Sequence, residues 1–228
     1  MISRGLHILL IASTLVAVGL LSLAPPSTVE GFSIGNPAAG VKFGVYLDLH
    51  CPDAGDFFAA LLRAKDTLIG GRPLSSYIDM RIHLFPLPFL HNSFLASVVA
   101  KYIELYHPER YLSFLQRQFD NMAKYKANAV DKTQREVQSM LIEDAIAVMD
   151  GVEDQHLTDI FGNEKIDSMA RSSFKFGSYA GVTGTPSLVL NGVFIDRTFD
   201  TAESLADYLA GYAKVQESLS ATERSNEL

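Results

Sequence analysis

Scarcity of cysteine sets the first limit on this chain. Cys51 is the only cysteine among 228 residues, so no internal disulfide can form and the hydrophobic core has to stabilise the fold. The hydrophobic content of 48% is enough for one domain with a full core, or for one domain that carries a sizeable insertion. Cys51 is therefore a free thiol, part of a mixed disulfide or part of an intermolecular bridge.

Positive charge is also scarce. The 19 lysines and arginines are outnumbered by 26 acidic residues, and the formal net charge of −7 argues against a nucleic-acid partner. The six histidines show no spacing typical of metal ligands, and no glycine-rich phosphate loop or serine nucleophile elbow is present. We therefore expect no metal and no resident cofactor. No Asn-x-Ser/Thr sequon indicates the compartment.

The N-terminus has the pattern of an export signal. Arg4 is followed by an apolar run over residues 5–24, so residues 1–24 are a cleaved signal peptide or a retained membrane anchor. Either outcome predicts the secretory pathway, with the protein secreted, in the lumen of the endoplasmic reticulum, or membrane-anchored through residues 5–24. Ser225-Asn226-Glu227-Leu228 shares only its last two residues with the endoplasmic-reticulum retrieval tetrapeptide.

A strand, a helix and a second strand follow a linker. Residues 25–40 form the linker, with one short strand near Val29–Ile34. The nearly continuous apolar residues of Val41–Leu49 predict a strand buried on both faces, and Pro52 starts a helix. Alternation over residues 77–84 predicts a strand parallel to the first. The apolar helix face is formed by Phe57, Phe58, Leu61, Leu62 and Leu68.

The second half is helical and then returns to strands. Helical spacing predicts an insertion over about 92–162, followed by a helix from residue 163 or 164 to Tyr179. Asn191-Gly192 predicts a hairpin between strands 187–190 and 193–196. Thr201 caps a last helix, and the polar tail 218–228 is expected to be disordered.

This order of elements predicts an α/β protein with a thioredoxin-like fold, in which a mixed central sheet carries a helical insertion. The chain resembles the DsbA-like branch of the thioredoxin superfamily over a domain at about 41–217. The motifs that carry the resemblance are Cys51-Pro52, Phe85-Pro86-Leu87-Pro88 and Gly181-Val182-Thr183-Gly184-Thr185-Pro186. Cys51-Pro52-Asp53, Leu84-Phe85-Pro86-Leu87-Pro88 and Ser173-Phe174-Lys175-Phe176 are similar to a group of eukaryotic thioredoxin-like proteins.

The resemblance implies a substrate site around the thiol. The proline that matches Pro186 is cis in that family and lies against the cysteine, while the backbone of the residue before it pairs with a bound peptide. Thr185 and Pro186 are accordingly expected to face Cys51, with Pro52 and His50 beside it. The alternative is that Pro186 is an ordinary turn proline before the hairpin.

The chain departs from the family at Ala54, which fills the place of the second cysteine and turns a CxxC motif into CPDA. Without a resolving thiol, only one-thiol chemistry at Cys51 is open, with glutathione or a client thiol as co-substrate. The helix start favours a thiolate, as would a protonated His50, whereas Asp53 and Asp56 oppose it. The alternative is an inert, half-buried thiol.

Asp48 ends the buried strand just before the thiol. It is either a proton acceptor for Cys51 or a carboxylate that caps nearby loop amides.

Three functions remain open for the chain. The first is an extracytosolic one-thiol disulfide oxidoreductase that acts on polypeptide or glutathione thiols. The second is a redox-inactive module that binds extended polypeptide, as a chaperone would. The third is a glutathione transferase or isomerase of the same fold.

Overall fold

The computed structural model describes residues 30–126, 131–150, 154, 156–199 and 201–226, with side chains described up to Val215. The predicted leader and the first residues of the predicted linker lie outside this part. The unit Gly31–Leu228 is described below on its own. Within the described residues, no helix is both long enough and apolar enough to cross a membrane.

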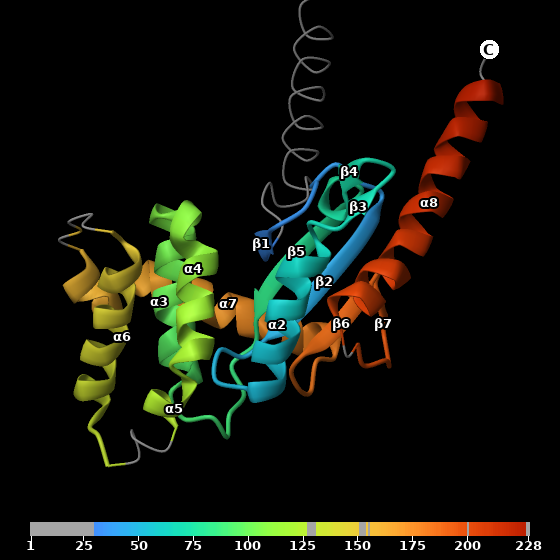
Figure 1. Ribbon diagram of the computed structural model, residues 1–228. Helices are drawn as coiled ribbons and strands as arrows, with labels where there is room; N and C mark the ends of the chain where they lie inside the picture. Colours follow the sequence, from blue (N-terminus) through green and yellow to red (C-terminus); the bar gives the residue numbers. More distant parts are fainter. Residues whose placement is uncertain (1–29, 127–130, 151–153, 155, 200, 227–228) are drawn as a thin grey trace, which may run out of the picture. The chain divides into compact units, whose positions relative to one another are not determined.

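A five-stranded mixed sheet forms the centre of this unit (Figure 1). Its strands are β1 (Phe32–Ser33), β2 (Val41–Leu47), β5 (Ile78–Leu84), β6 (Ser187–Leu190) and β7 (Val193–Phe194), in the order β1-β5-β2-β6-β7. β2 pairs in parallel with β5 and antiparallel with β6, so Val45 lies between Ile82 and Leu188. The remaining two pairs, β1 with β5 and β6 with β7, are antiparallel.

β2 is covered on both faces because its side chains alternate between two apolar clusters. Val45 and Leu47 point into the large core formed with α2 (Pro52–Ala64) and α8 (Ala202–Asn226). Tyr46 points to the other face, where it packs in a small cluster beside α7 (Glu164–Ala180). Gly177 lets α7 approach, because a Cβ there would lie 2.6 Å from the ring of Phe85.

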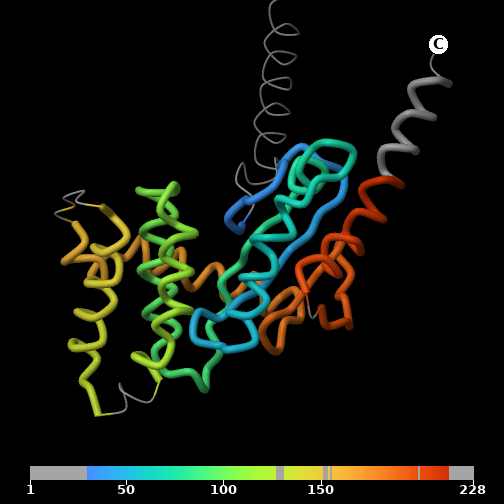
Figure 2. The backbone as a smooth tube through the Cα atoms, in the orientation of Figure 1, coloured from blue at the N-terminus to red at the C-terminus, as the bar shows by residue number. Residues whose placement is uncertain are grey.

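A block of helices lies between β5 and α7 in the sequence (Figure 2). It contains α3 (Ser93–Tyr106), η2 (Pro108–Arg110), α4 (Tyr111–Asp120), α5 (Met122–Tyr125), α6 (Gln134–Val148) and η4 (Leu157–Gly162). α3 packs on α4, α6 and α7. The capping box predicted before α6 is present, with Thr133 and Glu136 bonded reciprocally.

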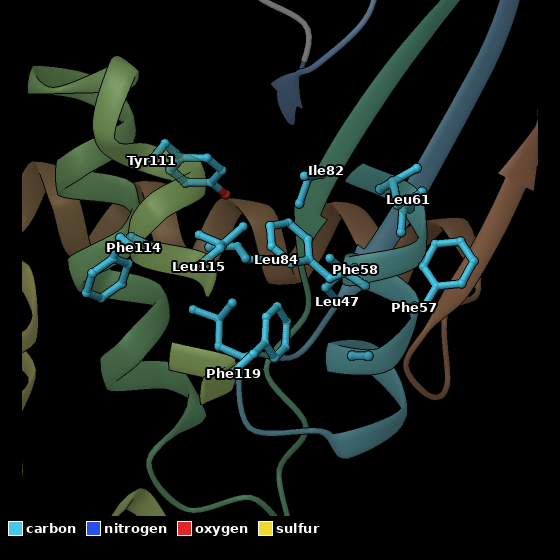
Figure 3. Close-up of a cluster of buried hydrophobic side chains, with 14 of the residues drawn as sticks. Leu47, Phe57, Phe58, Leu61, Ile82, Leu84, Tyr111, Phe114, Leu115 and Phe119 are labelled. Atoms are coloured by element: carbon cyan, nitrogen blue, oxygen red, sulfur yellow. The ribbon is translucent and has the colours of Figure 1, made fainter. Parts of the chain in front are cut away.

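The helical block shares its core with the sheet. Leu115 and Phe119 of α4 face Leu84 of β5 and Phe58 of α2 (Figure 3). The ring centroids of Phe58 and Phe119 are 5.2 Å apart. The mixed sheet and the helical block confirm the predicted α/β fold with a helical insertion.

Two expectations about elements were wrong. The first wrong expectation placed Leu68 on the first helix, but α2 ends at Ala64. Leu68 instead pairs with Pro73 in a small hairpin formed by β3 (Leu68–Ile69) and β4 (Arg72–Pro73). The hairpin is followed by η1 (Leu74–Ser76). Gly70 and Gly71 allow this hairpin, since both have positive φ angles of 58° and 84°.

The expected disorder from Ser218 also differs from the structure, in which α8 continues to Asn226. The physical reason is local: after Gly211 no glycine or proline interrupts the run, and alanine, glutamate, lysine and glutamine favour helix.

Candidate functional site

Cys51 lies at the point where β2 has ended and α2 begins. It is the N-cap residue of α2, with Pro52 in the first helical position and the Cys51 amide bonded to the Asp48 carbonyl at 3.1 Å. Its side chain is 7% exposed. The Sγ thiol donates to the backbone oxygen of Thr185 at 3.2 Å. Two segments 134 residues apart in the sequence thus meet at this thiol.

The second segment is the loop between α7 and β6. α7 ends at Gly181, whose φ is 90°, and the Thr185–Pro186 peptide bond further along is cis. Ser187 then starts β6 opposite Tyr46, while its hydroxyl donates to the Gly184 carbonyl at 2.7 Å. The loop therefore holds the carbonyl of Thr185 against Cys51, at the end of the sheet where β2 finishes and β6 starts (Figure 1).

Ala54 occupies the place where a resolving cysteine would lie. Its side chain is 0% exposed and packs in the main core beneath the start of α2. Pro52, Asp53 and Asp56 are exposed on the outside of the same turn. The site thus offers one sulfur atom, with a proline and carboxylates on the solvent side.

Asp48 is engaged by three donors in a buried loop. Oδ1 accepts from the His50 amide at 2.7 Å and from the Ser93 hydroxyl at 2.7 Å, and Oδ2 accepts from the Leu87 amide at 2.6 Å. Burial raises the pKa of Asp48 even though these hydrogen bonds oppose the shift. The arrangement matches the loop-capping alternative: the carboxylate ties the thiol turn to the loop after β5 and to the start of α3.

His50 does not supply the positive charge that the sequence analysis considered for a thiolate. Its side chain is 1% exposed and stacks on the ring of Tyr125, with ring centroids 5.0 Å apart. Burial lowers the pKa of His50 to about 4, with the charge of Lys126 acting in the same direction and the Gln118 amide opposing it. The imidazole is therefore neutral at pH 7.

Tyr125 belongs to a buried network that the sequence analysis missed. Its hydroxyl donates to Oδ2 of Asp144 at 2.5 Å, and Oδ1 of that carboxylate also contacts Arg117 Nε at 2.9 Å and Lys124 Nζ at 3.3 Å. The signal was present, because Asp144 falls on the inward face of α6 between Leu141 and Ala145. A carboxylate at a core position of a helix indicates a buried partner.

No group of three or more histidine, cysteine, aspartate or glutamate residues suited to a metal ion is found among the residues that the structure describes.

Residues 27–208 match the family model described as thioredoxin. The chain belongs to the thioredoxin family. The matched range includes Cys51, Ala54 and the Thr185–Pro186 pair, so the thiol turn and the cis-proline loop are both parts of the family domain. Among curated proteins, no sequence relative is detected.

Solved structures with the same fold include three bacterial proteins, one of which is described as a thiol-disulfide exchange protein. BdbD from Bacillus subtilis in its oxidised form is 17% identical and superposes with a TM-score of 0.59. The matched region covers 81% of this chain and 93% of the BdbD chain. The thiol-disulfide exchange protein α-DsbA2 from Wolbachia pipientis is 15% identical, with a TM-score of 0.58. The match covers 80% of this chain and 87% of the α-DsbA2 chain. The catalytic domain of ScsC from Proteus mirabilis is 18% identical, with a TM-score of 0.55. The match covers 84% of this chain and 91% of the ScsC domain. At these identities the likeness shows the fold.

Proposed function

We propose that this thioredoxin-family protein is a one-thiol disulfide oxidoreductase in which Cys51 is the nucleophile. The observation that carries the proposal is the contact between Sγ of Cys51 and the carbonyl of Thr185, directly before the cis Pro186 and at the N-terminus of α2. Backbone amides at a helix start favour the negative charge of a thiolate, whereas the Thr185 carbonyl accepts from the neutral thiol, so a substrate has to displace this hydrogen bond before Cys51 ionises.

The reaction uses two exchanges of sulfur partners. The Cys51 thiolate attacks a mixed disulfide between a client and glutathione, forms a new S–S bond with one sulfur, and expels the other as a thiolate. An external thiol such as glutathione then attacks the adduct, which releases Cys51 as a thiolate again. The external thiol has to resolve the adduct because Ala54 has no sulfur.

The loop around Thr185 supports binding of an extended substrate. The Thr185 hydroxyl is buried without a hydrogen-bond partner among the described residues, and Pro52 is exposed beside the thiol. A client sulfur bonded to Cys51 would bring its own backbone next to Thr185. We place this chemistry in the secretory pathway, in line with the apolar run in residues 5–24.

A second candidate is a redox-inactive module that binds polypeptide beside Thr185. It is favoured by the low exposure of Cys51, 7%, because attack on a disulfide requires access to the sulfur. A glutathione transferase or isomerase is the third candidate and predicts saturable binding of glutathione without an adduct.

The test is the formation of a glutathione adduct, which can involve only Cys51 because the chain has no other thiol. Purified protein is incubated with glutathione disulfide and weighed by intact-mass spectrometry, with Cys51→Ser as the matched control. We expect one glutathione per chain, removed by free glutathione, and none on the variant. Absence of an adduct from folded protein, together with client binding retained by Cys51→Ser, would establish the binding module instead.

A further inference from the structure

A pocket of about 820 Å³ is lined in part by His50, the residue before the thiol. It lies between the loop after β5, the start of α3 and the residues around α5 and α6. Its lining residues are His50, Phe89, Leu90, His91, Asn92, Phe94, Leu95, Tyr125, Lys126, Lys132, Gln134 and Val137. Neither Cys51 nor Thr185 is among them. We propose that this pocket binds an amphipathic organic anion, a carboxylate attached to an apolar body.

The charge of the lining selects an anion. Among the described residues, Lys126 and Lys132 line the pocket and no aspartate or glutamate does, although the whole chain has a net charge of −7. The ammonium group of Lys126 lies close enough to affect the ionisation of both His50 and Asp48. Lys126 and His50 thus line the same pocket, and a bound carboxylate would be paired with the ammonium group.

His50 supplies a polar group to the wall of the pocket. Its ring nitrogen Nε2 is buried and makes no hydrogen bond of ordinary geometry among the described residues, although the Gln118 side chain lies close enough to affect the ionisation of the ring. Buried polar atoms are almost always bonded, so the His50 ring has hydrogen-bonding capacity that a ligand beside it would use. The neutral imidazole can donate one N–H, and a carboxylate oxygen would accept it.

The rest of the wall is apolar. Tyr125 lines it together with the apolar side chains of Phe89, Leu90, Phe94, Leu95 and Val137. Phe89 is 68% exposed, which is unusual for phenylalanine and leaves room for a ligand to cover it. The volume lies in the range of small-molecule sites, where an apolar wall and a few polar groups divide the work of binding and orientation.

A neighbouring pocket of about 450 Å³ provides a control. It shares Leu90, His91 and Phe94 with the first pocket and is also lined by Arg171 and Lys175. Arg171 is already paired with Asp167 and lies over the ring of Phe94. A ligand in the first pocket depends on Lys126, whereas one in the second depends on Lys175.

The experiment is calorimetric titration of the full chain with octanoate, with octylamine and octan-1-ol as probes of equal length and different charge. We expect saturable binding of one octanoate, no saturable binding of octylamine, and weaker binding of octan-1-ol. Lys126→Ala should weaken octanoate at least tenfold, and Lys175→Ala should leave its affinity unchanged. Cys51→Ser should also leave it unchanged, which separates this site from the proposed redox chemistry.

A second variant tests the polar anchor. His50→Phe keeps a ring to stack on Tyr125 but removes both nitrogens, so it should weaken octanoate binding severalfold while the thermal unfolding transition stays cooperative. The proposal is overturned if octanoate does not bind, if octylamine binds equally well, or if Lys175→Ala rather than Lys126→Ala removes the binding.

Discussion

Removing the charge of Asp144 should destabilise the protein by about 3 kcal/mol, a magnitude typical of breaking a buried ion pair from one side. The side chain of Asp144 is 0% exposed and accepts from the Tyr125 hydroxyl, while Arg117 and Lys124 pair with it. We take the low end of the usual range because these two cations are 38% and 33% exposed and would be hydrated after the change.

The assay is urea denaturation of Asp144→Asn at pH 7, followed by far-ultraviolet circular dichroism. Asp120→Asn is the matched control, since Asp120 is an exposed carboxylate that bonds only to Gln116 among the interactions described, and its change should stay within about 0.5 kcal/mol. A loss below about 1 kcal/mol for Asp144→Asn, by comparison with typical surface changes, would refute the reasoning.

The effect should also depend on pH. Burial opposes ionisation of Asp144, but the bonds from Tyr125, Lys124 and Arg117 together hold the pKa of this carboxyl below its usual range. The stabilisation from the charge is therefore complete above the carboxyl's ordinary pKa and is lost as the pH falls through the lower value of the folded state. The gap in stability between wild type and Asp144→Asn should narrow accordingly at acid pH. A gap that stays constant would contradict this assignment.

Three other predictions concern the thiol turn, His50 and α7. With glutathione disulfide as the oxidant, Ala54→Cys should form a disulfide with Cys51, seen as the loss of two hydrogen atoms from the intact mass and as reactivity toward an alkylating agent only after reduction. Because the pKa of His50 is about 4 in the fold and ordinary in the unfolded chain, the unfolded state binds the extra proton between pH 6.5 and 4. The free energy of unfolding should therefore decrease as the pH is lowered through that window. In urea titrations, His50→Phe should make this decrease smaller. Gly177→Ala should cost about 1–3 kcal/mol through its clash with the Phe85 ring, whereas Gly211→Ala, in open space on α8, should stabilise by about 0.5–1 kcal/mol in the same assay.

Local features of the fold could be predicted from neighbouring residues. The turn at Asn191-Gly192 has the positive φ angles, 50° and 83°, that this pair of residues tolerates, and the capping box before α6 involves residues three apart. The helix start at Cys51-Pro52 likewise depends on neighbouring residues. The hairpin at Gly70-Gly71 was missed because the preceding apolar residue, Leu68, also fits helical spacing.

The properties of the candidate site also divide into those that the sequence determines and those that need the tertiary structure. The sequence alone determined that one thiol lies at a helix start, that Ala54 cannot resolve an adduct, and that residues along Val41–Leu47 form a buried strand, because each depends on residue type and short-range spacing. Only the tertiary structure decided that the thiol contacts Thr185 and that His50 is neutral. It also decided that the Asp48 carboxylate bonds to the thiol turn, the loop after β5 and the start of α3. Those properties come from burial and from contacts between segments far apart in the chain, and the free energy of a buried charge depends on the atoms that surround it.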